Sequence, residues 1–468
     1  MSFRRWLRTP DARWLLAVFA LALIVRLIVV TVVTPNPRDG RFDDSVFYDS
    51  AARHLANGDG YVFDPAIWLT YDGKPVFAGE SELTPTALWP PGYPLTLAVI
   101  YAVSGDSVTV ARFANALFGA LTAALVFLIA RRLFDLAAAV AAGAALAVMP
   151  AHVLFTAILL SETYFGFLLA AILALCVYFV FGRERPPLFV IFGLGVLTAF
   201  TGYVRGEFLA FGGVLALLML WQWRARSLPA LAALAAGALL IITPWTVRNL
   251  VVFDEPLIGT TGSGRTMLQG HNPDADGGPS LIAVGRVEAP FAGLPRDEIE
   301  VRSNKEASRQ AREWAMDHKL KELDLVGRRM WQLFRSDEAG VSWLQSNKPW
   351  FSPANRDRLI NLSTAYFWGL VAIALASAPV WWRPPGRVFD GRDARRLVVF
   401  AIIPYYLLIF GVLFVGDPRY HYAMYLPLAV FGGAGIAAIG RITASQWREV
   451  SGGRWPGAAA ATSGVPER

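Results

Sequence analysis

The sequence has little of the charge that keeps a water-soluble protein in solution. Only 17% of its 468 residues are charged, whereas soluble globular chains carry about 25%. Hydrophobic residues make up 55% of the chain, and the mean hydropathy is +0.43. A soluble protein of this composition would expose large apolar patches to water. The composition therefore excludes a cytosolic enzyme and a disordered protein, and it favours a polytopic membrane protein.

Cysteine and lysine are also scarce. The single cysteine, Cys176, lies within an apolar run, so the sequence offers neither a disulfide framework nor a thiolate metal site. Only five residues are lysine, and the arginines behind the net charge of +7 are scattered through short loops. A nucleic-acid-binding surface instead gathers its basic residues on one stripe. We therefore expect no nucleic-acid partner and interpret the arginines as a signal of membrane topology.

Ten apolar runs approach the roughly 20 residues that a membrane-spanning helix needs. They lie at about 14–33, 108–130, 137–158, 162–181, 187–203, 207–223, 228–246, 362–382, 397–415 and 420–440. A further run, 93–103, is too short to cross a bilayer. The sequence thus predicts an all-α polytopic membrane protein with about ten transmembrane helices.

The distribution of arginine predicts the orientation of these helices. If the N-terminus is cytoplasmic and the 93–103 run does not cross, every arginine-rich short segment falls inside the cell. These segments contain Arg4, Arg5, Arg8 and Arg13, Arg131 and Arg132, Arg183 and Arg185, Arg224 and Arg226, Arg383 to Arg396, and the tail from Arg441. We therefore predict that both termini are cytoplasmic and that the short run is re-entrant or interfacial.

Two longer polar segments are left outside the cell by this topology. The loop 34–107 has ten acidic and four basic residues, and the segment 248–360 is polar enough to form a small soluble domain. Within the latter, Arg296 to Phe334 has the apolar spacing of an amphipathic helix at a membrane surface. The predicted units are an N-terminal transmembrane module (1–247), the soluble segment (248–360), C-terminal transmembrane helices (361–450) and a flexible cytoplasmic tail (451–468).

An acidic pair directly after the first span is the strongest local signal for chemistry. Asp43 and Asp44 precede Ser45 and a short helical pattern, so one carboxylate has a structural explanation as a helix cap. Capping needs only one of the two acids. A second carboxylate at the membrane face suits a general base or a ligand for a divalent cation such as Mg²⁺ or Mn²⁺. Tyr48 follows on the same short helix.

Other ionisable residues gather near the predicted outer ends of the spans. Ionisable groups at membrane depth are costly and often mark a site, although each of these residues alone also suits a structural ion pair. A group of arginines there suits a phosphate, because the planar guanidinium binds phosphate oxygens in pairs. The residues are Arg26, Glu162, Arg205, Glu207, Arg248, Asp417 and Arg419.

Several segments in this order resemble the GT-C glycosyltransferases, and more narrowly glycosyltransferase family 39. The acidic pair is followed by Gly58-Asp59-Gly60-Tyr61 and then by Pro90-Pro91-Gly92-Tyr93-Pro94, which taken alone forms a rigid turn. Further similar segments are Leu160-Ser161-Glu162-Thr163, Thr243-Pro244-Trp245-Thr246-Val247-Arg248-Asn249, Gly270-His271-Asn272-Pro273-Asp274 and Asp417-Pro418-Arg419-Tyr420. The resemblance runs from the first span to the last and includes the protein O-mannosyltransferases and the lipid A aminoarabinose transferase.

The resemblance implies transfer of a hexose or pentose from a polyprenyl-phosphate donor at the outer face of a bacterial cytoplasmic (inner) membrane. Asp43 matches the family's catalytic Asp and would act as general base on an acceptor hydroxyl, with inversion. Asp44 stands where the family usually has Glu. The segment from Trp89 to Pro94 lacks charged residues that the lipid A enzyme has in this loop, which argues against that specific acceptor.

The other site residues follow from the same resemblance and from the outer-face charges. Arg205, Arg248, Arg419 and Arg26 are expected to bind the donor phosphate, since cations stabilise the charge of the leaving group. The expected supporting residues are Glu162, Glu207, Tyr48, Tyr93, His271, Asn272 and Tyr420. No cofactor is required, although Asp43 and Asp44 suit a divalent cation. The expected partners are the lipid-linked donor, an extracytoplasmic acceptor and membrane lipid.

Two other classes of function fit some of the same features. A transporter or flippase for an amphipathic lipid would show paired halves and ionisable groups near the midplane, whereas the ionisable groups here crowd one face. A scaffold protein of the cell envelope would use Asp43 only as a helix cap. Loss of sugar transfer in an Asp43→Asn variant separates the transferase from both alternatives.

Overall fold

The computed structural model describes residues 9–39, 43–64, 70–71, 74–75, 82–345, 349–381 and 391–450. Arg4, Arg5, Arg8 and the predicted tail 451–468 lie outside these residues. The helices of the N-terminal half are α2 (Pro10–Val32), α3 (Asp44–Asn57), α4 (Gly92–Ser104), α5 (Val108–Leu133), α6 (Leu136–Val148), α7 (Pro150–Leu154), α8 (Ser161–Leu175), α9 (Leu188–Val204), α10 (Phe211–Trp223) and α11 (Leu228–Phe253).

The second half of the chain is also helical. Its helices are α12 (Ser263–Gly270), α13 (Ile282–Glu288), α14 (Arg296–Asp317), α15 (Lys319–Phe334), α16 (Ala339–Leu344), α17 (Pro353–Ala376), α18 (Ala378–Trp381), α19 (Gly391–Phe400), α20 (Ile402–Leu408) and α21 (Tyr425–Val450). Short 3₁₀ or π-helical turns are η1 (Phe155–Ala157), η2 (Cys176–Val180), η3 (Gly206–Phe208), η4 (Arg224–Ser227), η5 (Ala289–Phe291), η6 (Ile409–Leu413) and η7 (Pro418–Met424).

Strands occur in the first loop as two small antiparallel pairs. The described strands are β1 (Val62–Phe63), β2 (Thr70–Tyr71), β3 (Lys74–Pro75) and β4 (Thr84–Pro85), and the pairs are β1 with β4 and β2 with β3. The all-α prediction is confirmed, since each of these strands has only two residues.

Within the described residues, seven helical segments are long and apolar enough to cross a membrane. These are Pro10–Val32, Val108–Leu133, Ser161–Val180, Gly206–Phe253, Pro353–Ala376, Asp393–Leu413 and Pro418–Gln446. An eighth is obtained if α6 and the segment Pro150–Ala157 form one span bent by 57°. The long helices also expose apolar side chains, such as Ile24 and Ile28 at 56% each, as expected where lipid replaces water. The chain is a multi-pass membrane protein.

The prediction of about ten spans is not confirmed, for reasons of length and continuity. The predicted run 187–203 corresponds to α9, which has only 17 residues and counts as a shorter apolar helix. The runs 207–223 and 228–246 correspond to α10 and α11, which with η3 and the η4 turn between them count as one candidate segment of 48 residues. The run 137–158 is interrupted before Pro150, because proline disfavours helical backbone in the residue that precedes it.

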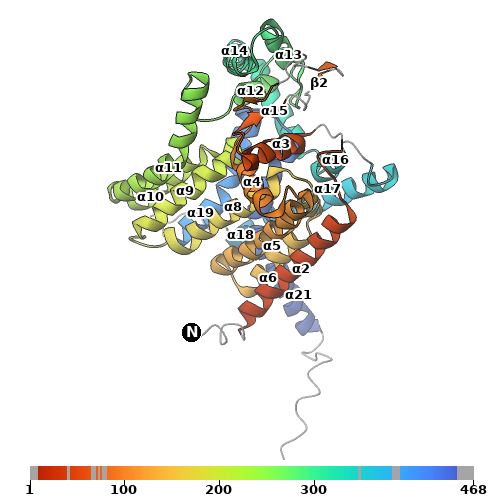
Figure 1. Cartoon of the computed structure of the whole chain (residues 1–468). Coiled ribbons are helices and arrows are strands. Elements are labelled where there is room, and N and C mark those ends of the chain that lie inside the picture. The colour runs from red at the N-terminus through yellow and green to blue at the C-terminus, as the bar shows by residue number, and fades with distance from the viewer. Residues whose placement is uncertain are drawn as a thin grey trace, which may run out of the picture.

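The polar segment between α11 and α17 has a small hydrophobic core of its own. Leu268 of α12, Ala283 and Val287 of α13, and Ala307 and Ala311 of α14 pack together. Figure 1 shows α12, α13 and α14 above the long helices, with α3 beneath them. The helical character predicted for 248–360 is therefore present, and the domain boundaries remain predictions.

The helix α4 corresponds to the short apolar run 93–103. It has 13 residues, which at 1.5 Å per residue reach about 20 Å. That length falls short of the roughly 30 Å hydrocarbon layer. The helix packs against α3, and Asp49 of α3 accepts a hydrogen bond of 2.6 Å from the Tyr101 hydroxyl of α4. This contact helps to fix α3, and with it the acidic pair, against the long helices.

Candidate active site

The acidic pair lies at the N-terminus of α3. Asp43 has extended backbone (φ −146°, ψ 173°), and its Oδ1 accepts hydrogen bonds from the Ser45 amide, at 2.9 Å, and from the Ser45 hydroxyl. Asp43 is therefore the cap of the helix, and it is buried, with 6% of its surface exposed. Asp44 occupies the first turn, where a negative charge interacts favourably with the helix dipole.

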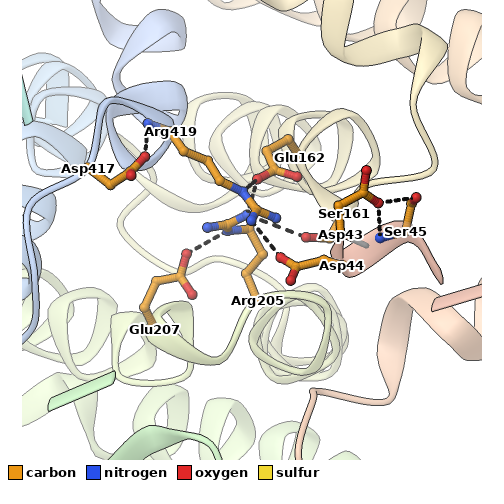
Figure 2. Close-up of polar contacts among 9 residues, drawn as sticks. All are labelled: Asp43, Asp44, Ser45, Ser161, Glu162, Arg205, Glu207, Asp417 and Arg419. Carbon is orange, nitrogen blue, oxygen red and sulfur yellow. Dashed lines mark hydrogen bonds and ion pairs between the residues drawn. The ribbon is translucent and has the colours of Figure 1, made fainter. Parts of the chain in front are cut away.

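Asp44 belongs to a chain of ion pairs that joins four parts of the sequence. Its Oδ2 lies 2.5 Å from Nη1 of Arg419, whose Nε also contacts Oε1 of Glu162. The same Glu162 oxygen lies 2.8 Å from Nη1 of Arg205, and Nε of Arg205 lies 2.6 Å from Oε1 of Glu207. Figure 2 shows these groups converging from α3, α8, η3 and η7. We call Asp44, Glu162, Arg205, Glu207 and Arg419 the ion-pair cluster.

The ends of helices position each member of the ion-pair cluster. Glu162 is the second residue of α8, Arg205 directly follows α9, and Glu207 lies in η3. Arg419 is in the first turn of η7, where the Asp417 carboxylate accepts from its backbone amide at 2.8 Å. Helix ends place charged groups at the boundary of the apolar layer, where their desolvation costs less than at mid-depth.

Burial makes the electrostatics of the ion-pair cluster strong. Glu162 is fully buried, and Arg205 and Arg419 are 8% and 7% exposed. Burial lowers the pKa of Arg205, but the nearby carboxylates of Glu207 and Glu162 outweigh it, so the pKa lies above its ordinary value. Burial raises the pKa of Tyr48, and the Asp44 carboxylate adds to this rise. Both side chains keep their usual protonation at neutral pH.

Aromatic rings surround the charged groups. The Tyr48 ring meets the Tyr93 ring edge-on at 5.3 Å, and Tyr420 stacks on Phe410 at 4.0 Å. The Arg205 guanidinium lies 5.9 Å from the Tyr420 ring. A supporting role was expected for Tyr48, Tyr93 and Tyr420. In the structure Tyr48 and Tyr420 lie beside the ion-pair cluster, and Tyr93 packs against Tyr48. These rings lower the local dielectric and so strengthen the ion pairs.

Two of the four arginines expected at the donor phosphate have other contacts in this structure. Arg26 is fully buried and donates to the carbonyl oxygens of Ala22 and Ala147, at 3.0 Å each, while its Nη2 lies 2.7 Å from Nδ1 of His152. Because Ala147 lies in the last turn of α6, Arg26 satisfies a carbonyl at the break between α6 and α7. No described contact joins Arg26 to the ion-pair cluster.

Arg248 likewise bonds to the backbone of the first loop. Its guanidinium donates to the carbonyl oxygens of Thr86 and Tyr61, at 2.9 Å each, and lies 5.2 Å from the Trp245 ring. Arg248 thus ties α11 to both strands of the β1–β4 pair at their ends. Among the contacts of the described residues, none links it to the ion-pair cluster.

His271 and Asn272 organise the end of α12. His271 Nδ1 lies 2.8 Å from Glu322 of α15, and its Nε2 lies 3.1 Å from the Leu413 carbonyl of η6. Burial and the nearby Arg329 lower the pKa of His271 below its ordinary value, although Glu322 opposes this shift. The Asn272 amide donates to the Leu268 carbonyl at 2.8 Å. His271 thus joins the end of α12 to α15 and η6, whereas Asn272 closes the end of α12 itself, and no described hydrogen bond links either residue to the ion-pair cluster.

Sequence reasoning missed residues that complete the site. The ring of Trp343 in α16 lies 4.5 Å from the Arg419 guanidinium, a cation–π contact. The Tyr405 hydroxyl of α20 donates to the backbone carbonyl of Glu207. Neither residue stands in a charged or motif-like segment. Ser161 also contributes to the site, because its hydroxyl accepts a hydrogen bond of 3.4 Å from Nη1 of Arg205. Its position beside Glu162 in the sequence was a signal for this contact.

A metal site needs several ligating side chains close together. In the described part of the chain, no group of three or more His, Cys, Asp or Glu side chains is placed to hold a metal ion. Asp44 is paired with Arg419, and Asp43 accepts from Ser45.

Comparison with known proteins identifies the fold. The family model for dolichyl-phosphate-mannose-protein mannosyltransferases matches residues 89–247. An oligosaccharyltransferase from Archaeoglobus fulgidus, tethered to an acceptor peptide, matches with a TM-score of 0.53 and 14% identity, over 97% of this chain and 52% of that one. The chain has the GT-C glycosyltransferase fold.

Two further solved structures are similar to this chain to different extents. The archaeal oligosaccharyltransferase AglB from A. fulgidus, in complex with an inhibitory peptide and a dolichol-phosphate, has a TM-score of 0.53 and 15% identity, with 94% and 52% of the two chains covered. ArnT from Cupriavidus metallidurans, bound to undecaprenyl phosphate, has a TM-score of 0.42 and 17% identity, with 94% and 80% of the two chains covered.

The extent of the likeness is limited in two ways. The GT-C chain spans about half the length of the oligosaccharyltransferases that it matches. No curated protein sequence matches it. The expected resemblance to GT-C proteins is confirmed at the level of the fold, and the activity is a separate question.

Proposed function

We propose that this GT-C protein is a membrane glycosyltransferase. It moves a hexose or pentose from a polyprenyl-phosphate donor to a hydroxyl group of an extracytoplasmic acceptor, which is a lipid, a glycan or a protein. The observation that carries the proposal is the buried Asp43 carboxylate beside Asp44 and its partner Arg419. The N-terminus of α3 thus places a carboxylate base close to the guanidinium group of Arg419.

Asp43 is the general base in this proposal. Its carboxylate takes the proton of the acceptor hydroxyl as that oxygen attacks the anomeric carbon. The bond from the anomeric carbon to the phosphate oxygen breaks, and its electron pair leaves with the polyprenyl phosphate. Attack from the face opposite the leaving group inverts the anomeric centre.

Arg205 and Arg419 stabilise the leaving phosphate in this proposal. Preorganised cations in a buried site stabilise developing charge strongly. Both guanidinium groups are already paired with carboxylates, so an incoming phosphate binds by replacing one of these contacts. Asp44 is the partner that yields, since its side chain is 28% exposed whereas that of Glu162 is fully buried. The dolichol-phosphate bound by the A. fulgidus AglB supports a lipid phosphate as the donor.

The remaining expected residues take supporting roles. In this proposal Arg26 and Arg248 hold backbone carbonyls and shape the surroundings of the site, and the phosphate contacts come from Arg205 and Arg419. The proposed steps run without a divalent cation. In this proposal the protein lies in a bacterial cytoplasmic membrane, as the family resemblance implies, and the distribution of arginine places its active site on the outer face.

The transporter alternative is less well supported by the positions of the charges. Glu162 begins α8 and Arg205 follows α9, so the ion-pair cluster lies at the ends of helices. Transporters bind their substrates near the bilayer midplane, often at broken helices. The transferase therefore fits these charges better.

An Asp43→Asn variant tests the proposal. Mass spectrometry of envelope glycans and glycolipids compares a deletion strain with strains complemented by the natural protein, by Asp43→Asn or by Asp317→Asn. Asp317 is an exposed acid at the end of α14 and serves as the matched control. We expect the deletion and Asp43→Asn strains to lack the same sugar, with transfer reduced at least a hundredfold, and Asp317→Asn to restore it.

The folding of the variant is checked in the same experiment. Asp43→Asn keeps an oxygen that accepts from Ser45, so we expect normal amounts in the membrane and a normal melting temperature in detergent. Full restoration of the missing sugar by Asp43→Asn would overturn the assignment of the base. A deletion strain with unchanged glycans and glycolipids would overturn the proposed activity as a whole.

A further inference from the structure

A second site lies where two short connections between helices meet. A pocket of about 1210 Å³ is lined by the segment from Gly182 to Pro186, which joins α8 to α9, and by the segment from Gln222 to Ala230, which joins α10 to α11. The Trp223 indole donates to the Arg183 carbonyl at 3.1 Å and links the two segments. A hydrogen bond within the fold therefore holds the two sides of the pocket together. The pocket has no residue in common with the ion-pair cluster.

The lining of this pocket is strongly basic. Each connection contributes two exposed arginines, Arg183 and Arg185 from the first and Arg224 and Arg226 from the second, and Glu184 is the single acid in the lining. None of the four arginines forms an ion pair with another residue that the structure describes. Four unneutralised guanidinium groups around one pocket favour a multivalent anion, and guanidinium groups match phosphate oxygens in particular.

The backbone at Arg224 adds a second observation. Arg224 has a φ of +51°, a left-handed conformation that non-glycine residues rarely adopt. The strained residue ends α10 and turns the chain into η4, which brings Arg224 and Arg226 to the pocket. Strain of this kind persists only where the surrounding structure enforces it, and such residues are frequent at binding sites.

The same two helices carry the pocket and the ion-pair cluster at their opposite ends. Glu162 begins the span Ser161–Val180, and Gly182 follows it, so the two ends are about 30 Å apart. In the same way, Leu188 begins α9 beside the pocket, and Arg205 follows its other end. The pocket therefore lies at the opposite face of the membrane, where the predicted topology places the cytoplasm.

Apolar side chains next to the pocket are open to the lipid. Leu188 and Leu228 belong to the lining and are 50% and 66% exposed, and the adjacent Phe189 is 77% exposed. The ligand thus meets guanidinium groups at one end and apolar side chains at the other. A phospholipid has this division between headgroup and acyl chains, whereas free phosphate does not.

We propose that this pocket binds an anionic phospholipid of the inner leaflet with a two-phosphate headgroup, as in cardiolipin. Two arginine pairs from two connections match two phosphates in one molecule. Basic pockets between membrane helices on the cytoplasmic side bind such headgroups in other proteins. Because the connections fix the spacing of α8, α9, α10 and α11, the bound lipid holds these helices together at the inner face.

Native mass spectrometry of the full chain tests the proposal. The purified protein in detergent is titrated with tetraoleoyl cardiolipin, dioleoyl phosphatidylglycerol or dioleoyl phosphatidylethanolamine. The comparison uses the natural protein, an Arg185→Gln/Arg226→Gln variant and an Arg312→Gln/Arg358→Gln control. The control removes two exposed arginines that lie on α14 and α17, outside the pocket.

We expect one cardiolipin per chain, bound at least tenfold more tightly than phosphatidylglycerol and not displaced by 10 mM inorganic phosphate. The Arg185→Gln/Arg226→Gln variant is expected to bind cardiolipin at least tenfold more weakly, while the control binds as the natural protein does. An Arg185→Lys/Arg226→Lys variant, which keeps the topology charges, is expected to bind severalfold more weakly.

Several results would overturn the proposal. Equal cardiolipin binding by the Gln variant and the control shows that the pocket is not the site. Equal affinity for phosphatidylglycerol rules out a two-phosphate headgroup, and displacement by inorganic phosphate shows that a free anion occupies the pocket. If the Gln variant does not insert into the membrane, the Lys variant, which preserves every positive charge, decides between these outcomes.

Discussion

At the scale of single residues, the partners of a side chain decide its role more than its type or its position near a helix end. Four arginines near the ends of helices illustrate this, namely Arg26, Arg205, Arg248 and Arg419. Two of them bond to backbone carbonyls, and the other two share the carboxylate of Glu162. Only the latter two can exchange a carboxylate partner for a phosphate.

Glu162 is the residue on which the ion-pair cluster depends most. It is fully buried and contacts both Arg205 and Arg419. Removing one partner from a buried ion pair leaves an uncompensated charge and costs about 3–5 kcal/mol. We therefore expect Glu162→Gln to lower the free energy of unfolding by that amount and to abolish sugar transfer.

Glu313→Gln is the matched control for Glu162→Gln. Its carboxylate pairs with Arg309 at 2.6 Å but is 53% exposed, and exposed pairs contribute about 0–1 kcal/mol. Thermal unfolding in detergent compares the two variants. Equal, small losses of stability in both would contradict the structural role assigned to Glu162.

At the scale of elements, the close packing of α9 on α11 positions one side of the site. A Cβ atom added at Gly195 of α9 would lie 2.1 Å from the Leu234 carbonyl of α11, and one added at Gly237 of α11 would lie 2.1 Å from the Phe192 carbonyl of α9. Small residues allow this close approach of two backbones in a membrane. Arg205 follows directly at the end of α9.

A pair of glycine variants on the same helix tests this packing. Gly195→Val forces α9 and α11 apart, and overpacking of this kind costs about 1–3 kcal/mol or more. Gly193→Val introduces the same side chain where no atom lies within 4 Å. We expect a lower melting temperature and reduced sugar transfer only for Gly195→Val. Equal effects of the two variants would indicate that the cost comes from valine itself and not from the contact.

The contact between α12, α15 and η6 predicts a dependence of stability on pH. Burial and Arg329 hold the pKa of His271 below its ordinary value of 6.5. As the pH falls, the unfolded chain therefore binds this proton before the folded chain does. The contribution of neutral His271 to the free energy of unfolding is fully present above pH 6.5. It is lost as the pH falls from 6.5 toward the lower pKa of this residue in the folded state.

Melting temperatures at pH 7.5 and pH 5.5 check this dependence. Each unit by which the pKa of His271 is lowered corresponds to about 1.4 kcal/mol. We expect the natural protein to lose stability over this interval and His271→Gln to lose less, because glutamine does not titrate. The same loss in both proteins would assign the pH dependence to other groups.

At the scale of the whole molecule, the arginine-rich connections and the ion-pair cluster lie at opposite ends of the same helices. The connection Gly182–Pro186 follows the span that Glu162 begins. Positive residues near short loops are retained in the cytoplasm. The orientation predicted from the sequence therefore puts the proposed transferase site outside the cytoplasm and the proposed lipid site on the inner face.

Single-cysteine labelling checks this orientation. Cys176 is fully buried, so a Cys176→Ala background leaves no other thiol. In this background, Asp317→Cys at the end of α14 is expected to react with a membrane-impermeant maleimide in intact cells. Glu184→Cys, in the basic pocket, is expected to react only after the membrane is opened. The reverse pattern would overturn the predicted topology and, with it, the side assigned to both sites.

Several features of the fold were predictable because they depend on local sequence. Apolar runs of about 20 residues predict helices in a membrane, since lipid offers no hydrogen bonds to the backbone. Asp43 before Ser45 predicted a helix start, and Asp43 caps α3. The number of spans was less predictable. The break before Pro150 has a local cause in the proline, but the sequence does not show whether the two helical pieces form one bent span, and α9 has only 17 residues.

The candidate site was predicted in part for the same reason. Charged residues at the ends of apolar runs were visible in the sequence, and Asp44, Glu162, Arg205, Glu207 and Arg419 converge in the structure. Their neighbours Trp343 and Tyr405 carry no charge and occur in no motif, so only their contacts reveal them. The basic pocket was also hidden, because its arginines were explained by topology alone.

By itself, the sequence determined that this protein is helical and embedded in a membrane, because composition and run length decide how a chain meets lipid. It also determined which residues were candidates for chemistry, through their cost at membrane depth. Only the tertiary structure decided which arginines meet carboxylates and which meet carbonyls. These partners are distant in the chain, as Asp44 and Arg419 are, and helix packing alone brings them together.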